Sequence, residues 1–111
     1  MSYILVFEND PNIAETLKIC LEYEGHVAVW CKNHYNIIYT LSELGPPKLI
    51  LFDYVFEEDP QLVIDTIRIM CGSKIILMTG RNKPEDIVHL HGLDGLLKKP
   101  FSLEDLYSLI N

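Results

Sequence analysis

The sequence predicts an α/β fold: a doubly wound parallel sheet of five strands, each followed by a helix, written (βα)5. Five short apolar runs alternate with five helical patterns, with no repeat, linker or low-complexity stretch between them. This rhythm is typical of a parallel sheet covered by helices on both faces. Right-handed crossovers then favour a doubly wound sheet, which binds ligands at the carboxyl ends of its strands.

The strands are predicted from apolar runs that are continuous rather than alternating, as expected for strands buried on both faces. Each run ends in polar or turn-forming residues, which gives the strand a clear limit. The expected strands are Tyr3–Phe7, Val27–Cys31, Leu49–Phe52, Lys74–Met78 and Gly95–Lys98.

The helices are predicted from apolar residues at helical spacing and from their end signals. Asp10 and Asp59 each precede a proline, a pair that starts a helix well, and Ser102 with Asp105 resembles a capping box. The helices are expected from Asp10 to Gly25, from about Asn33 to Leu44, from Asp59 to Gly72, from about Pro84 to His91, and from Ser102 to Ile110. The residues expected on their buried stripes include Ile13, Leu17, Cys20, Leu21, Ile37, Ile38, Leu41, Leu44, Val63, Ile64, Ile67, Met70, Leu103, Leu106, Tyr107 and Ile110.

Length and composition limit the domain organisation and the class of protein. With 111 residues, 49% of them hydrophobic, the chain suits one domain spanning 1–111 with a core of its own. Its apolar runs are far shorter than the roughly 20 residues of a membrane span, and Met1–Phe7 lacks a basic leader region. A net charge of −7 without a Lys/Arg cluster argues against direct binding of nucleic acid. We therefore expect a cytoplasmic protein.

Cysteine, histidine and tryptophan give no sign of a separate site. Cys20, Cys31 and Cys71 form no CxxC pattern, so neither a disulfide framework nor a thiolate zinc site is indicated, and a reduced cytosol fits. His89 and His91 are two apart, which on a helix places them on different faces. The aromatic residues, with Trp30 on the second strand, are interpreted as packing residues rather than a binding platform.

Polar residues follow four of the expected strands directly. Glu8, Asn9 and Asp10 follow the first strand, Asp53 the third, Thr79 the fourth and Lys99 the fifth. The fold would gather them at one edge, where neighbouring carboxylates repel unless they are protonated or joined by a divalent cation. Oxygen ligands of this kind suit Mg²⁺. A hydroxyl and an ammonium facing the same point could stabilise the oxygens of a phosphoryl group.

Four segments carry a family resemblance over essentially the whole chain. The first segment, ILVFENDPNI, resembles the acidic opening of receiver domains, and the second, LILFDYVF, resembles their phosphoacceptor strand. The third, KIILMTG, resembles the switch-threonine strand, and the fourth, LLKKPF, resembles the lysine-proline signature. The chain thus resembles the response regulator receiver domain of two-component signalling, in the CheY-like superfamily. This resemblance implies a flavodoxin-like strand order of 2-1-3-4-5.

The resemblance also implies residue roles. Asp53 would be the phosphorylated aspartate, Thr79 the switch hydroxyl and Lys99 the partner of the phosphoryl group. The Mg²⁺ site would draw on Glu8, Asn9, Asp10, Asp53 and the backbone carbonyl of Val55. The Lys99-Pro100 bond resembles a position that is cis in the family.

Partners follow from the same resemblance. A sensor histidine kinase or a phosphotransfer protein would supply the phosphoryl group. A downstream effector protein would read the face made by the expected helix 84–91, strand 95–98 and the last helix, and a homodimer could use the same face. The chain would catalyse at most its own phosphorylation and dephosphorylation, and would not otherwise be an enzyme.

Several positions depart from the family pattern. Asn9 stands where a second acid is usual, and Asp10 can be read equally as a replacement ligand or as the helix N-cap, so we predict weak metal binding. The loop after Asp53 lacks the usual proline and glycine. Leu96 stands at the usual switch aromatic, so no aromatic ring there can report phosphorylation.

Two functions therefore remain open. The first is a phosphorylatable receiver, which the joint presence of Asp53, Thr79 and Lys99 favours. The second is a degenerate pseudo-receiver, a protein-interaction module independent of phosphorylation, which Asn9 and Leu96 favour. A flavodoxin-like cofactor binder is disfavoured because no Gly/Ser/Thr-rich loop that could cradle a phosphate follows the first strand.

Overall fold

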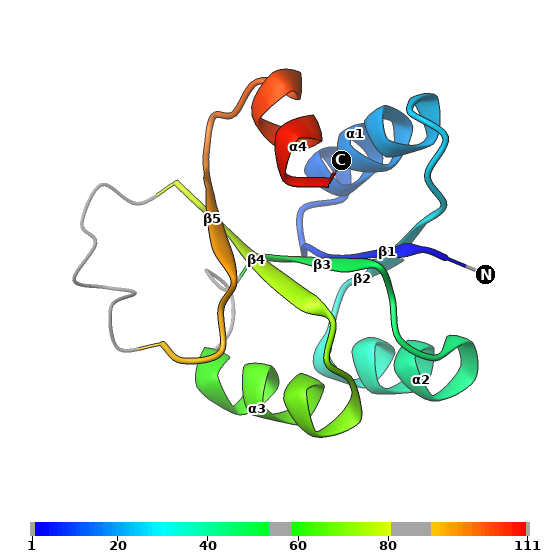
Figure 1. Ribbon diagram of the computed structural model, residues 1–111, viewed down its shortest axis with the longest axis vertical. Helices are drawn as coiled ribbons and strands as arrows, with labels where there is room; N and C mark the ends of the chain where they lie inside the picture. The colour runs from blue at the N-terminus through cyan, green and yellow to red at the C-terminus, as the bar shows by residue number, and fades with distance from the viewer. Residues whose placement is uncertain (1, 54–58, 81–89, 111) are drawn as a thin grey trace.

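The five predicted strands form one parallel sheet. The computed structural model describes residues 2–53, 59–80 and 90–110. The strands are β1 Ile4–Phe7, β2 Ala28–Cys31, β3 Leu49–Asp53, β4 Lys74–Thr79 and β5 Gly95–Lys98. Their order is β2-β1-β3-β4-β5 with parallel pairing throughout, so the strand order implied by the resemblance is confirmed (Figure 1).

Helices cover both faces of this sheet. The described helices are α1 Pro11–Tyr23, α2 His34–Leu44, α3 Pro60–Met70 and α4 Leu103–Ile110. α1 and α4 lie on one face, and α2 and α3 lie on the other (Figure 1). The helix expected at Pro84–His91 falls mainly on residues outside the described ranges. No helix within those ranges has both the length and the apolar character needed to cross a membrane.

Side-chain caps fix where the helices begin. The Asp10 side chain accepts a hydrogen bond from the backbone N–H of Asn12 at 2.9 Å, which confirms the predicted start of α1. At α4, the Ser102 hydroxyl accepts from the Asp105 N–H at 3.1 Å, and the Asp105 carboxylate accepts from the Ser102 N–H at 3.3 Å. This reciprocal pair is the predicted capping box.

The sheet separates two apolar clusters, one beneath each layer of helices. Consecutive residues of a strand face opposite clusters, as Ile50 and Leu51 of β3 do. Three residues expected in the core are instead exposed, namely Leu44, Met70 and Leu103. Each is the terminal residue of its helix, where the chain leaves the sheet for a loop, so the predicted stripes extend one position too far.

Two of the predicted site residues belong to the sheet itself. β3 and β4 each run one residue beyond the predicted limit, so they end on Asp53 and Thr79. Asp53 pairs with Met78, and Thr79 pairs with Lys98. The backbone of both residues is thus held in the ladder at the carboxyl edge of the sheet.

Candidate functional site

The polar residues that follow the strands meet at the carboxyl edge of the central strands. Glu8 follows β1, Asp53 ends β3, Thr79 ends β4 and Lys99 follows β5. The first three are nearly inaccessible to solvent, with exposed fractions of 1% for Glu8, 4% for Asp53 and 5% for Thr79. Buried polar groups are costly unless they are paired, so this arrangement needs compensating contacts.

Lys99 supplies part of this compensation. Its Nζ donates to Asp53 Oδ2 at 2.8 Å and to Glu8 Oε1 at 3.1 Å. Glu8 Oε2 in turn accepts the backbone N–H of Asp10 at 3.3 Å. One ammonium therefore joins two buried carboxylates from different strands.

The electrostatics of the site follow from this crowding. Burial raises the pKa of Glu8, the neighbouring Asp53 carboxylate raises it further, and Lys99 only partly opposes both. For Lys99, burial alone would lower the pKa, but its contacts with Asp53 and Glu8 raise it overall. Lys99 therefore stays charged at neutral pH, while Glu8 takes up a proton more readily than an exposed glutamate does.

Thr79 is linked to Lys99 through the backbone. The Lys99 N–H donates to the Thr79 carbonyl oxygen at 2.7 Å, which continues the pairing of β4 with β5 past its last rung. The following Lys99-Pro100 bond is cis, as the resemblance implied. Backbone hydrogen bonding thus joins Thr79 to the residue that follows β5.

The predicted ligands Asn9 and Asp10 directly follow Glu8 in the chain. Asn9 is exposed, and the Asp10 side chain caps α1 through the Asn12 N–H. The predicted N-cap role of Asp10 is confirmed, and its role as a metal ligand stays a prediction. Val55, whose carbonyl was a predicted ligand, lies outside the described residues.

The remaining donor set still fits Mg²⁺ in its usual binding mode. Within the part of the chain that the structure describes, no group of three or more His, Cys, Asp or Glu side chains is placed to hold a metal ion. However, Mg²⁺ is commonly bound through one or two carboxylates, several waters and the phosphate oxygens of a substrate. Glu8 and Asp53 offer the two carboxylates, so the site suits Mg²⁺ together with a phosphoryl group better than Mg²⁺ alone.

The sequence does not predict the contact that Trp30 makes at the site. The indole Nε1 of Trp30, on β2, donates to the backbone carbonyl oxygen of Glu8 at 2.6 Å. Trp30 was interpreted as a packing residue only. The sequence signal was weak, because the contact depends on the register of β1 against β2, which places Val6 opposite Trp30.

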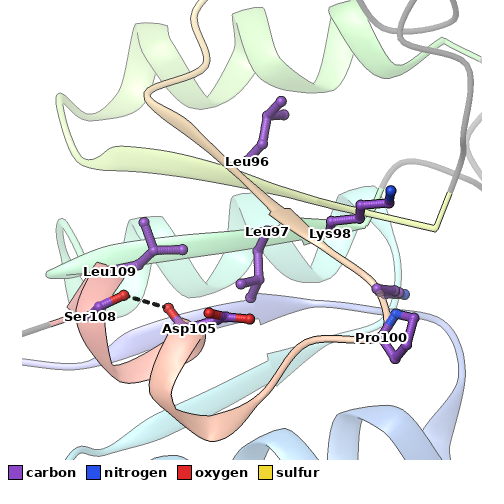
Figure 2. Close-up of a pocket in the computed structure, with 8 residues that line it drawn as sticks. Leu96, Leu97, Lys98, Pro100, Asp105, Ser108 and Leu109 are labelled. Atoms are coloured by element: carbon purple, nitrogen blue, oxygen red, sulfur yellow. Dashed lines mark hydrogen bonds between the residues drawn. The ribbon is translucent and has the colours of Figure 1, made fainter.

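A hollow of about 540 Å³ lies beside the site, between β5 and α4 (Figure 2). Its walls are formed by Leu96, Leu97, Lys98, Lys99, Pro100, Asp105, Ser108 and Leu109. Within α4, the Ser108 hydroxyl donates to the carbonyl oxygen of Asp105 at 2.9 Å. Lys99 therefore belongs both to this hollow and to the acidic site.

Comparison with family models gives no match, and neither does comparison with curated proteins. Solved structures, in contrast, match the chain along its length. A two-component response regulator from Clostridium difficile is 26% identical with a TM-score of 0.89, covering 99% of this chain and 93% of its own. The signal receiver domain of a signal transduction histidine kinase from Syntrophus aciditrophicus is 29% identical with a TM-score of 0.84. This match covers 99% of this chain and 87% of that domain's chain. A CheY-like response regulator receiver domain protein from Methanospirillum hungatei JF-1 is 24% identical with a TM-score of 0.86. This match covers 99% of this chain and 90% of that protein's chain.

Proposed function

We propose that this chain, which has the CheY-like fold of response regulator receiver domains, forms one receiver domain over 1–111 and accepts a phosphoryl group on Asp53. One observation carries the proposal: the Asp53 carboxylate ends β3 at the carboxyl edge of the sheet, 2.8 Å from the Lys99 ammonium. Ligands of doubly wound sheets bind at this edge. The similarity to receiver structures supports a role in a phosphorelay.

The chemistry is nucleophilic transfer to a carboxylate. An Asp53 oxygen attacks the phosphorus of a phosphohistidine in line with the P–N bond, a P–O bond forms, and the P–N electrons leave with the imidazole, which takes a proton. The Lys99 ammonium stabilises the phosphoryl oxygens, since it already lies against Asp53. Asp53 becomes an acyl phosphate, which water later hydrolyses.

Glu8 and Asp53 would hold Mg²⁺, with the Asn9 side-chain carbonyl and the Val55 backbone carbonyl as further candidates from the sequence. When bound, Mg²⁺ supplies positive charge that offsets the negative charge of the two carboxylates and the phosphoryl group. Because the Asp10 side chain caps α1, we propose that it adds negative charge near the site without acting as a ligand. We propose that Mg²⁺ binds weakly until a phosphoryl group is present.

Thr79 is proposed as the hydroxyl that responds to phosphorylation. Phosphorylation would favour a pre-existing conformation in which Thr79 lies closer to Asp53. Its carbonyl accepts the Lys99 N–H, so this movement would reach the end of β5 and the hollow between β5 and α4. An effector protein would bind this face, and a homodimer could form through it.

The phosphoryl donor would be a sensor histidine kinase or a phosphotransfer protein, in the cytoplasm. The chain would supply positioning and charge, and would carry out no reaction beyond its own phosphorylation and dephosphorylation.

Incubation with acetyl phosphate tests the proposal. We expect intact-mass spectrometry to show one added phosphoryl group with Mg²⁺ and none with a chelator. Asp53→Asn should abolish the added mass, while the matched variant Asp59→Asn, at the cap of α3, should keep it. An unmodified wild-type protein would overturn the proposal and favour the interaction module, which Asn9 and Leu96 favour as departures from the family pattern.

A further inference from the structure

Trp30 lies on the edge strand β2 with its indole directed toward the acidic site. Its Nε1 donates to the Glu8 carbonyl oxygen at 2.6 Å, although 41% of the residue remains exposed. A ring exposed to this degree contributes less to the core than a fully buried one.

Glu8 is one residue past the end of β1. Residues of β2 form hydrogen bonds with both the N–H and the carbonyl oxygen of Glu8. The Glu8 N–H donates to the Cys31 carbonyl oxygen at 3.2 Å, and its carbonyl oxygen accepts from Trp30. The backbone torsions of Glu8 set where its carboxylate points. That carboxylate bridges Lys99 and the Asp10 N–H.

We infer that Trp30 is a positioning residue of the acidic site, which fixes the Glu8 backbone so that the Glu8 carboxylate faces Lys99 and Asp53. This inference rests on the proposed function, since it assigns Trp30 a part in preparing the site for Mg²⁺ and the phosphoryl group. Trp30 acts through Glu8 and touches neither the phosphoryl group nor the reacting oxygen. Without the indole N–H, the carboxylate would sample orientations away from Asp53.

The hydrogen bond can be removed without changing the ring, because Trp30 is the only tryptophan of the chain. Biosynthetic replacement by 3-benzothienylalanine exchanges the N–H for sulfur, whereas 5-fluorotryptophan keeps the N–H and serves as the matched control. We expect the sulfur analogue to raise the Mg²⁺ concentration for half-maximal phosphorylation about fivefold, the scale of one neutral hydrogen bond. The maximal rate at saturating Mg²⁺ should change less. The fluorinated protein should match the wild type.

A second readout does not depend on phosphorylation. In ¹⁵N-labelled protein, Trp30 gives a single indole N–H resonance, which Asp53→Asn and Lys99→Met should shift because both change the partners of Glu8. Arg68→Lys, in α3 on the opposite face of the sheet, should leave it in place. An indole resonance that ignores both site variants would overturn the inference.

Failure of the proposed function and failure of the positioning role of Trp30 give different results. If the wild-type protein takes up no phosphoryl group while the indole resonance responds to the site variants, the proposed function fails and the positioning by Trp30 stands. If the wild type is phosphorylated and the sulfur analogue has the same Mg²⁺ dependence, the positioning role fails and the proposed function stands.

Discussion

Lys99 and Glu8, 91 positions apart in the chain, form a partly buried ion pair of 3.1 Å between the ends of β5 and β1. The same ammonium also binds Asp53, so a single positive charge serves two carboxylates. The site therefore depends on Lys99 for stability as well as for the proposed chemistry.

Replacing Lys99 by methionine should destabilise the protein strongly. The change removes an ammonium that contacts two nearly inaccessible carboxylates, and breaking a buried pair from one side costs about 3 kcal/mol. Urea unfolding at pH 7 measures the loss. Lys98→Met, at the neighbouring exposed lysine, should stay within about 0.5 kcal/mol of the wild type. Equal effects of the two variants would show that the ion pairs of Lys99 contribute no net stability.

Glu8 should make stability fall as the pH rises. Its pKa in the folded protein lies above the ordinary 4.5, so between these values the folded state binds more protons than the unfolded state. The stability that this provides is complete below pH 4.5 and is lost as the pH rises through the raised pKa. Glu8→Gln should therefore flatten the pH profile of the free energy of unfolding above pH 4.5.

Unfolding curves measured from about pH 4 to about pH 8 test this linkage. Glu15→Gln, an exposed glutamate of α1, provides the control and should reproduce the wild-type profile. The interpretation is wrong if the Glu8→Gln profile runs parallel to that of the wild type.

Asp10 should behave as a cap and not as a metal ligand. Asp10→Ala removes the acceptor of the Asn12 N–H and should cost about 1 kcal/mol of stability, as should Asn33→Ala at the cap of α2. Asp10→Ser keeps a capping oxygen and should recover most of the loss. Phosphorylation by acetyl phosphate should need the same Mg²⁺ concentration in Asp10→Ser as in the wild type, and a large increase would restore Asp10 as a ligand.

Asp94 should stabilise the turn before β5 in a pH-dependent way. Burial alone would raise the pKa of Asp94. Its pKa is nevertheless lowered overall, because the Ile75 N–H donates a hydrogen bond to the carboxylate and the Arg68 guanidinium pairs with it. A lowered pKa gives stability that is present above the ordinary value of 3.8 and is lost as the pH falls through the lowered pKa. Because the side chain is 41% exposed, solvent screening keeps the Arg68 pair below about 1 kcal/mol.

Asp94→Asn measures this contribution. The variant should be less stable than the wild type at neutral pH, and the difference should shrink in acid. Glu43→Gln, an exposed carboxylate of α2, should show no such convergence. A constant difference between the wild type and Asp94→Asn across the acid range would contradict the assigned cause.

The meeting of Asp53, Thr79 and Lys99 could be predicted because each follows or ends an apolar run. Parallel strands bring their carboxyl ends to one edge, so positions along the chain become positions in space once the strand order is known. The order itself came from the family resemblance. Neither the strand order nor the meeting of the strand ends depends on how the side chains pack.

The cap formed by Asp10 could be predicted, whereas the contact of Trp30 with Glu8 could not be predicted in the same way. For Asp10, the sequence leaves open both a cap and a metal ligand, and the contact with the Asn12 N–H shows the cap. The Trp30 contact with Glu8 depends on the register of two strands that are joined by a helix, and the sequence does not specify that register. Leu44 shows a third limit, because helical spacing does not reveal where a helix leaves the sheet.

The central claim, that Asp53 is the phosphoacceptor, is tested most directly by locating the acyl phosphate. Reduction with borohydride converts a phosphorylated aspartate into homoserine, which peptide mass spectrometry can assign to a position. After incubation with acetyl phosphate and Mg²⁺, homoserine is expected at position 53 alone. Homoserine at another acidic residue, or at none, would contradict the account.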